Sequence, residues 1–207
     1  MKENNKQGKE QEILAAAEQE FLSKGYEGAR TTSIAKAAGV THAMLHYYFR
    51  TKESLFERIV DEKFRLMLQS MLAVIGDPSL PVVERLKSGI SAHFDFVAQN
   101  SKLPLFVINE VLSRPERYAM LQNKMKNLAT DLFSGLQQDI DNAAERGEIV
   151  HIDVRMLLMS IVSLNIFAIV TFPFMRPLIG ELGEERERFL SQRKAENIET
   201  ILHRIKR

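Results

Sequence analysis

Residues 30–52 read RTTSIAKAAGVTHAMLHYYFRTK, and this stretch decides both the fold and the function that we expect. No Asp or Glu occurs from residue 28 to residue 52, although the composition of the chain would place about three acids in a segment of that length. The same stretch holds four cations, Arg30, Lys36, Arg50 and Lys52. Because the DNA backbone carries a negative charge at each phosphate, a segment with cations and without acids indicates nucleic-acid binding.

The spacing of the residues in this stretch predicts two short helices. Thr31 or Thr32 can cap the first helix. Its inner face would hold Ile34, Ala35 and Ala38. Gly39 allows the left-handed backbone that ends a helix, and Thr41 can cap the second helix. The apolar face of the second helix would hold Leu45, Tyr48 and Phe49. So short a connection predicts a helix-turn-helix.

The segment around this motif resembles a known family. Residues 13–56, ILAAAEQEFLSKGYEGARTTSIAKAAGVTHAMLHYYFRTKESLF, are similar to the DNA-binding domain of the TetR family of bacterial transcriptional regulators. The matching features are Phe21, Gly25, Tyr26, Thr32, Ile34, Ala35, Ala38, Gly39, Val40, Leu45, Tyr48, Phe49, Lys52 and Leu55. The resemblance implies an all-α fold of about nine helices: an N-terminal three-helix helix-turn-helix domain and a larger C-terminal helical regulatory and dimerisation domain. Residues 57–207 match the family only in length, helicity and layout.

Helices are expected along the whole chain, since only 10 Gly and 6 Pro interrupt it and no sustained period-two alternation is present. Besides the motif at about 31–50, the predicted helices cover about 9–24, 52–75, 81–99, 104–114, 115–146, 153–172 and 183–205. We expect residues 1–56 to form an N-terminal arm with the DNA-binding domain, and residues 57–207 to form the effector-binding and dimerisation domain. The polar residues 1–12 predict either a flexible arm whose lysines reach DNA or a solvated tail.

Residues 156–172, MLLMSIVSLNIFAIVTF, carry no charge over 17 positions. This length is near the lower limit for a membrane span, but four polar residues interrupt it, Ser160, Ser163, Asn165 and Thr171. We expect no membrane insertion, and burial partly in the core and partly against a second subunit. In the last helix, Ile198, Ile201, Leu202 and Ile205 recur at three- or four-residue spacing. The resemblance implies that these residues belong to a homodimer interface formed by the last two helices, and we favour this interpretation. The alternative is that they cover the core of their own subunit.

A twofold dimer would place two recognition helices in successive major grooves, about 34–36 Å apart, on a palindromic double-stranded operator. The exposed face of the second motif helix is predicted to hold His42, Ala43, Met44, His46 and Tyr47. The expected phosphate contacts are Thr31, Thr32, Lys36, Thr41, Tyr47 or Tyr48, and Lys52. The family often has Gly, a small polar residue, Tyr and His where this chain has Ala43, Met44, His46 and Tyr47. An operator sequence therefore cannot be carried over from the family.

The resemblance also implies a small-molecule effector that binds in a mostly apolar pocket of the second domain. This effector would shift the helix at 52–75 and so change the distance between the two DNA-binding domains of the dimer. Candidate lining residues are Phe64, Met67, Met71, Phe94, Phe106, Asn109, Glu110, Met125, Leu128, Asn165 and Phe167. Met and Phe suit an adaptable cavity for an apolar or amphipathic ligand. Each of these residues could instead be plain core, and Asn165 could sit at the dimer interface.

Other classes of function have less support in the sequence. There is no Cys, and no acid within the motif could complete a metal site with His42 and His46, so we expect no metal and no cofactor. No catalytic constellation is present, which makes an all-α enzyme the weakest alternative. An effector-independent regulator or an architectural DNA-binding protein remains open. The polar N-terminus and the net charge of +1 favour a cytoplasmic protein with a local DNA-binding patch. The resemblance implies that it acts as a ligand-released repressor.

Overall fold

The computed structural model of the protein describes the backbone of residues 2–75, 77, 79–112 and 114–206, and their side chains apart from 2–7, 70–74, 124–125 and 127–132. The described residues contain helices and no strand, so the predicted all-α class is confirmed. They form two compact units, Met1–Leu66 and Met67–Arg207. Helix α4 (Lys52–Ile75) contributes residues to both units.

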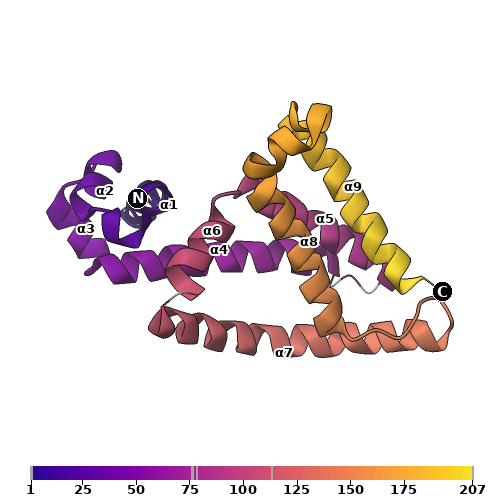
Figure 1. The fold of residues 1–207 in the computed structure, drawn as a ribbon. Coiled ribbons are helices and arrows are strands. Elements are labelled where there is room, and N and C mark those ends of the chain that lie inside the picture. The colour runs from indigo at the N-terminus through magenta and orange to yellow at the C-terminus, as the bar shows by residue number, and fades with distance from the viewer. Residues whose placement is uncertain (1, 76, 78, 113, 207) are drawn as a thin grey trace. The chain divides into compact units, whose positions relative to one another are not determined.

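The first unit contains α1 (Lys2–Gly28), α2 (Thr31–Ala37), α3 (His42–Tyr48) and the first part of α4 (Figure 1). Its core consists of apolar side chains with almost no exposed surface, among them Ile13, Ala17, Phe21, Ile34, Leu45, Leu55 and Phe56. The rings of Phe21 and Phe56 meet edge to face, with their centroids 5.4 Å apart. This contact joins α1 to α4 and holds the small unit together.

Helix α1 begins at Lys2, well before the start that the sequence predicted. The predicted flexible arm is therefore replaced by helix, although the side chains of residues 2–7 lie outside the described residues. Lys, Glu and Gln dominate this segment and are good helix formers, and Lys9 pairs with Glu12 one turn later at 2.6 Å. Near the other end, Gly25 has φ 68° and interrupts the helical geometry, which glycine allows without steric cost.

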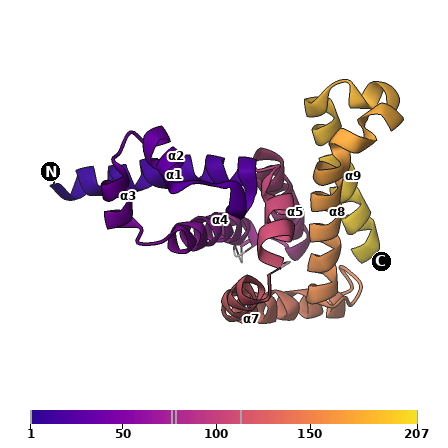
Figure 2. The ribbon, with the colours of Figure 1, turned by 60° about the vertical axis from the view of Figure 1, so that its left-hand side comes forward.

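The second unit is built from the remaining helices (Figure 2). They are α5 (Val82–Gln99), α6 (Leu103–Phe106), the π-helical turn η1 (Val107–Leu112), α7 (Pro115–Glu145), α8 (Val154–Met175), the 3₁₀ turns η2 (Arg176–Leu178) and η3 (Gly180–Gly183), and α9 (Arg186–Ile205). Helices α8 and α9 lie side by side, and α5 contacts both of them. These three helices and part of α7 enclose the main core.

Two boundaries differ from the prediction. Helix α8 starts after Asp153, whose carboxylate accepts a hydrogen bond from the Arg155 backbone N–H at 2.8 Å as an N-cap, as expected. It continues through Pro173 to Met175, because a proline so close to a helix end removes only one hydrogen bond. Helix α9 begins at Arg186 and not at Gly183, because Gly183 is the last residue of η3. A Cβ on Gly183 would lie 2.4 Å from the Arg176 carbonyl oxygen, so the turn requires glycine.

The apolar stripe of α9 covers the core of its own subunit. Ile201 and Ile205 are buried in one cluster with α5, α7 and α8 residues, and Ile198 and Leu202 pack against it. The favoured assignment of these residues to a dimer interface is therefore wrong for Ile201 and Ile205. The physical reason is that α9 contacts both α5 and α8, which together bury its inward stripe.

Helix α8 is the one helix in the described part of the chain whose length and composition would allow it to cross a membrane. One side of it is buried, at Val154, Leu157, Ile161, Asn165, Ile169 and Phe172. The core helix of a soluble protein has the same properties. Its other side remains exposed although it is also apolar, and this outward face is considered below.

Candidate nucleic-acid interface

The turn between α2 and α3 has the geometry that the sequence predicted. Gly39 has φ 63°, and its N–H donates to the Lys36 carbonyl at 3.2 Å. The Val40 N–H donates to the Ala35 carbonyl at 3.0 Å, which completes a Schellman ending of α2. The Thr41 hydroxyl then accepts a hydrogen bond from the Met44 N–H at 3.1 Å and caps α3. The two helices are thus fixed as a helix-turn-helix.

Helix α3 has one buried side and one side that faces solvent. Leu45 is buried beneath it. The residues predicted for the reading face are exposed or half-buried: His42, Ala43, His46 and Tyr47 are exposed, and Met44 is half-buried. Tyr47 has 73% of its surface exposed. A groove of DNA could therefore reach these side chains without any rearrangement of α3.

Several contacts hold the reading face in place. Thr31 Oγ1 and His42 Nε2 lie 3.0 Å apart, within hydrogen-bonding distance, and join the start of α2 to the start of α3. The rings of His42 and His46 meet edge to face with centroids 4.4 Å apart. His46 Nδ1 lies 3.3 Å from the Arg50 carbonyl oxygen. The outer side chains of α3 are therefore ordered by their neighbours before any DNA is bound.

The cations around α3 are of two kinds. Lys36 and Arg50 are exposed and available to phosphates, as is Thr32. Lys52 is half-buried: its ammonium donates to the Glu27 carbonyl at 3.3 Å and lies 4.5 Å from the centroid of the Tyr26 ring. Lys52 therefore has a structural task as well as any contact with phosphate. Arg50 was counted in the acid-free run but not among the expected contacts, although its exposure suits that role.

The loop into α4 is held by a reciprocal cap that the sequence reading overlooked. The Ser54 N–H donates to Thr51 Oγ1 at 3.0 Å, and the Thr51 N–H donates to Ser54 Oγ at 3.3 Å. The pattern Thr-x-x-Ser in the sequence is the signal that could have revealed it. Tyr48, half-buried at the end of α3, stacks edge to face with Tyr47. The basic end of the motif is therefore held by local contacts, as its start is.

Comparison with known proteins agrees with this geometry. Residues 13–59 match the family model of bacterial regulatory proteins, tetR family. A solved bacterial regulatory protein in the tetR family from Rhodococcus RHA1 has the same fold, with a TM-score of 0.72 and 24% identity over 96% of this chain and 97% of that one. Residues 13–59 are a DNA-binding domain of the TetR type. TetR-family proteins are DNA-binding transcriptional regulators and not enzymes.

The curated relatives of this chain act in different senses. An uncharacterized HTH-type transcriptional regulator of Bacillus subtilis, YdgC, is 26% identical over 72% of this chain and 81% of its own. The transcriptional activator FasR of Mycolicibacterium smegmatis is 24% identical over 75% and 68%. The transcriptional repressor BepR of Brucella suis is 28% identical over 66% of each chain. AibR, solved with isovaleryl coenzyme A and operator DNA, has a TM-score of 0.62 and 23% identity over 78% of this chain and 85% of its own.

The predicted effector residues fall in different surroundings. Phe94, Phe106 and Asn165 are buried in the second unit, and Met67 packs against its main core cluster. Phe64 is half-buried and belongs to the first unit. Asn109 and Phe167 are exposed, so neither lines an enclosed space with Phe94. The side chains of Met71, Met125 and Leu128 lie outside the described residues.

Glu110 is a half-buried carboxylate in the π-helical turn. Its Oε2 lies 3.6 Å from Arg117 Nη1, and the same guanidinium donates to the Glu110 carbonyl oxygen at 3.1 Å. Arg117 is itself buried. The π-helical turn is therefore tied to the first turn of α7 by an ion pair that is mostly removed from water. Turns of this kind are frequent at functional sites.

Asn165 belongs to a buried polar network that connects three helices. Its Nδ2 donates to the Ile90 carbonyl at 3.1 Å and lies 3.0 Å from His93 Nδ1, and its Oδ1 accepts from Asn197 Nδ2 at 2.9 Å. Because an amide nitrogen can only donate, His93 Nδ1 accepts and the neutral ring carries its proton on Nε2. Burial lowers the pKa of His93 to about 4. The network thus joins α5, α8 and α9, and most of the hydrogen-bonding capacity of Asn165 is occupied.

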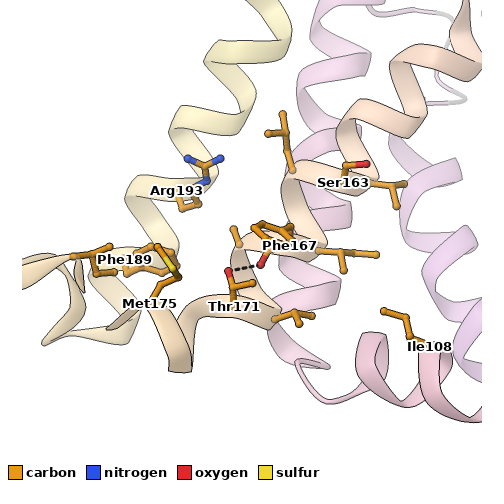
Figure 3. Close-up of a pocket in the computed structure, with 13 residues that line it drawn as sticks. Ile108, Ser163, Phe167, Thr171, Met175, Phe189 and Arg193 are labelled. Carbon is orange, nitrogen blue, oxygen red and sulfur yellow. Dashed lines mark hydrogen bonds between the residues drawn. The ribbon is translucent and has the colours of Figure 1, made fainter. Parts of the chain in front are cut away.

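A groove of about 700 Å³ runs over the outward face of α8 (Figure 3). Its lining is almost entirely apolar, with Phe167 near the centre and Ile108 of η1 at one border. At the other border lie Met175, Phe189 and Arg193, the last two from α9. Thr171 directs its hydroxyl back to the Phe167 carbonyl at 2.7 Å, so its polar group is satisfied within the helix. The groove is open to solvent and differs from the enclosed pocket that the sequence predicted.

Proposed function

We propose that this protein is a homodimeric repressor that leaves a palindromic operator when a small apolar or amphipathic effector binds its second unit. The observation that carries the proposal is the outward face of α8. Met156, Met159 and Phe167 on this face are 58%, 65% and 70% exposed. Soluble proteins rarely leave so many large apolar side chains of one helix in water unless a partner covers them.

A second copy of the chain is the partner that this face suits best. The inward side of α8 and the inward stripe of α9 are used within the subunit, so the outward side remains for contact between subunits. A twofold contact requires a patch that complements itself, and an apolar helix face meets that requirement when it crosses its own copy. The proposed dimer interface therefore keeps the outward residues of α8, which the sequence also suggested, and no longer includes Ile201 and Ile205.

The palindromic operator follows from the twofold dimer. Each protomer would offer one α3, and two such helices fit half-sites about 34–36 Å apart. Exposed Tyr47 and His42 are the side chains best presented to base edges, while Lys36 and Arg50 reach phosphates. The same face would bind non-specific DNA through its cations alone, with lower affinity.

The effector class rests on the apolar lining of the second unit. Phe94 and Phe106 are buried there, and Glu110, which pairs with Arg117, is the one charged residue on the predicted list. Asn165 is a weaker candidate for orienting a ligand because its amide already has three partners. AibR, which shares this fold, was solved with a coenzyme A thioester and operator DNA, and that pairing supports a ligand-responsive regulator. We place the protein in the cytoplasm, where its operator would be.

The repressing sense is the simplest consequence of an effector that disfavours the DNA-bound arrangement. A ligand can weaken operator binding only if it binds the DNA-free arrangement more tightly, and DNA must then weaken ligand binding by the same factor. BepR supports this sense and FasR, an activator, supports the opposite one. Reporter expression from a promoter that carries the operator distinguishes the two.

The test starts with selection of bound fragments from random DNA, followed by measurement of operator affinity in the presence of a panel of apolar and amphipathic compounds. The proposal expects a palindromic consensus and at least one compound that lowers operator affinity about 5- to 150-fold. A solid second unit that binds no compound would favour the effector-independent regulator. Selected fragments without twofold symmetry would overturn the dimeric arrangement.

A further inference from the structure

The C-terminal end of α4 is held by one buried arginine of α5. The last carbonyls of a helix lack partners within the helix and need them when they are buried. Ile75, the last residue of α4, is buried, and its carbonyl oxygen accepts a hydrogen bond of 2.6 Å from Arg85 Nε. Arg85 is itself only 7% exposed. The end of α4 is therefore fixed to α5 by a charge-assisted hydrogen bond inside the second unit.

The same guanidinium also reaches α7. Its Nη1 donates to Asp139 Oδ2 at 2.8 Å, which provides the countercharge that a buried arginine requires. Arg85 thus joins three helices at one point: the end of α4, its own helix α5, and α7. A displacement of α7 relative to α5 would act on the Ile75 carbonyl through this side chain.

A second, steric feature of the same joint is Gly89, one turn beyond Arg85 on α5. A Cβ built on Gly89 would lie 2.7 Å from both Cγ1 and Cδ1 of Ile75, closer than real atoms approach. The absence of a side chain at Gly89 therefore lets Ile75 lie directly on α5. The polar and the steric features are independent of each other, and both fix the position of the same residue.

We propose that Arg85 is a positioning residue that, together with Gly89, sets the direction in which α4 leaves the second unit. Through α4 it would set the distance between the two DNA-binding domains of the dimer. The inference rests on the proposed dimeric function. Helix α4 has 24 residues, which corresponds to about 36 Å at 1.5 Å per residue. A tilt of about 5° at the Ile75 end would move the other end by about 3 Å, close to the 3.4 Å rise of one base pair.

The experiment measures how strongly the protein prefers one spacing between half-sites. The probe is a palindromic fragment selected from random DNA by the unaltered protein, compared with the same fragment lengthened or shortened by one base pair between its half-sites. Variants are Arg85→Gln, Gly89→Ala and, as a conservative replacement, Arg85→Lys. The matched control is Gly135→Ala, which adds the same methyl group to a helix of the same unit where nothing lies within 4 Å. Binding to a single half-site is recorded in parallel at a temperature well below unfolding.

We expect the unaltered protein and Gly135→Ala to prefer the selected spacing by at least about tenfold, since one base pair also rotates the second half-site around the DNA axis. Arg85→Gln and Gly89→Ala should lower this ratio at least fivefold while half-site affinity stays unchanged. Arg85→Lys should lie between them and the unaltered protein, because an ammonium keeps the charge but not the forked geometry. A role in folding alone would lower thermal stability and leave the spacing ratio unchanged.

The possible failures can be told apart. If the folded, dimeric variants retain the spacing preference of the unaltered protein, the role of Arg85 and Gly89 is refuted and the proposed function stands. If Arg85→Gln does not fold, Gly89→Ala decides the question alone, since it removes no polar contact. If the unaltered protein itself has no spacing preference, the proposal that a dimer binds a palindromic operator is wrong. The inference about Arg85 is then overturned as well.

Discussion

The buried histidine of α5 should make the stability of the protein depend on pH in a defined window. The pKa of His93 is about 4 in the folded protein, against 6.5 for a solvated histidine, because burial disfavours the charged ring. Between these values the unfolded chain binds the proton more readily than the folded one. The stabilising effect of the neutral ring is therefore complete above pH 6.5 and is lost as the pH falls toward 4. At pH 5 the linkage relation gives a loss of about 2 kcal/mol relative to pH 7.5.

Urea unfolding at pH 5 and pH 7.5, at one fixed protein concentration, measures this loss. His93→Gln is the informative variant, since a glutamine oxygen can still accept from the Asn165 amide but does not titrate. We expect the difference in unfolding free energy between the two pH values to shrink by about 2 kcal/mol in this variant. His203→Gln, which removes an exposed ring, should keep the difference of the unaltered protein. If His93→Gln also keeps that difference, the neutral buried ring is not the cause and the reasoning is refuted.

Three other predictions concern the DNA-binding face and the subunit contact. Lys36→Ala should weaken binding to all DNA sequences and lower the slope of log affinity against log salt concentration by about one unit, as measured by salt titration of any duplex. Tyr47→Ala should instead change the order of affinities among operator variants. Unchanged binding in both variants would show that α3 is not part of the DNA interface. Thr41→Ala should lower the unfolding free energy by about 1 kcal/mol, because α3 loses its cap. Met159→Asp should yield a folded monomer in sedimentation experiments, whereas Ile201→Asp should fail to fold; a Met159→Asp dimer as tight as the original would refute the α8 contact.

The first unit could be predicted closely because its signals are local. Gly39, Thr41 and the apolar spacing around Leu45 lie within ten residues of one another, and each fixes a turn, a cap or a buried face without help from distant parts of the chain. The exposed set on α3 followed from the same periodicity. The exception is Lys52, whose contact with Tyr26 depends on how α1 returns to α4.

The second unit was harder because its decisive contacts join residues far apart in sequence. An apolar stripe such as that of Ile201 and Ile205 predicts burial but does not say whether the cover comes from the same subunit or from another. The hydrogen bond from Asn165 to His93 joins positions 72 residues apart, and Arg85 reaches Asp139 over 54 residues. No spacing rule in the sequence points to either contact. The enclosed pocket stays a prediction, since part of the expected lining lies outside the described residues.

The most direct test of the central claim is the stoichiometry of the complex with a selected operator fragment, measured by native mass spectrometry on the full chain. The account predicts two chains for each palindromic duplex. The Met159→Asp variant, in which the α8 contact is disrupted, should bind as one chain for each duplex. Its affinity for the full operator should fall to that for a half-site. A single chain bound to each duplex by the unaltered protein, with affinity equal to that of Met159→Asp, would contradict it.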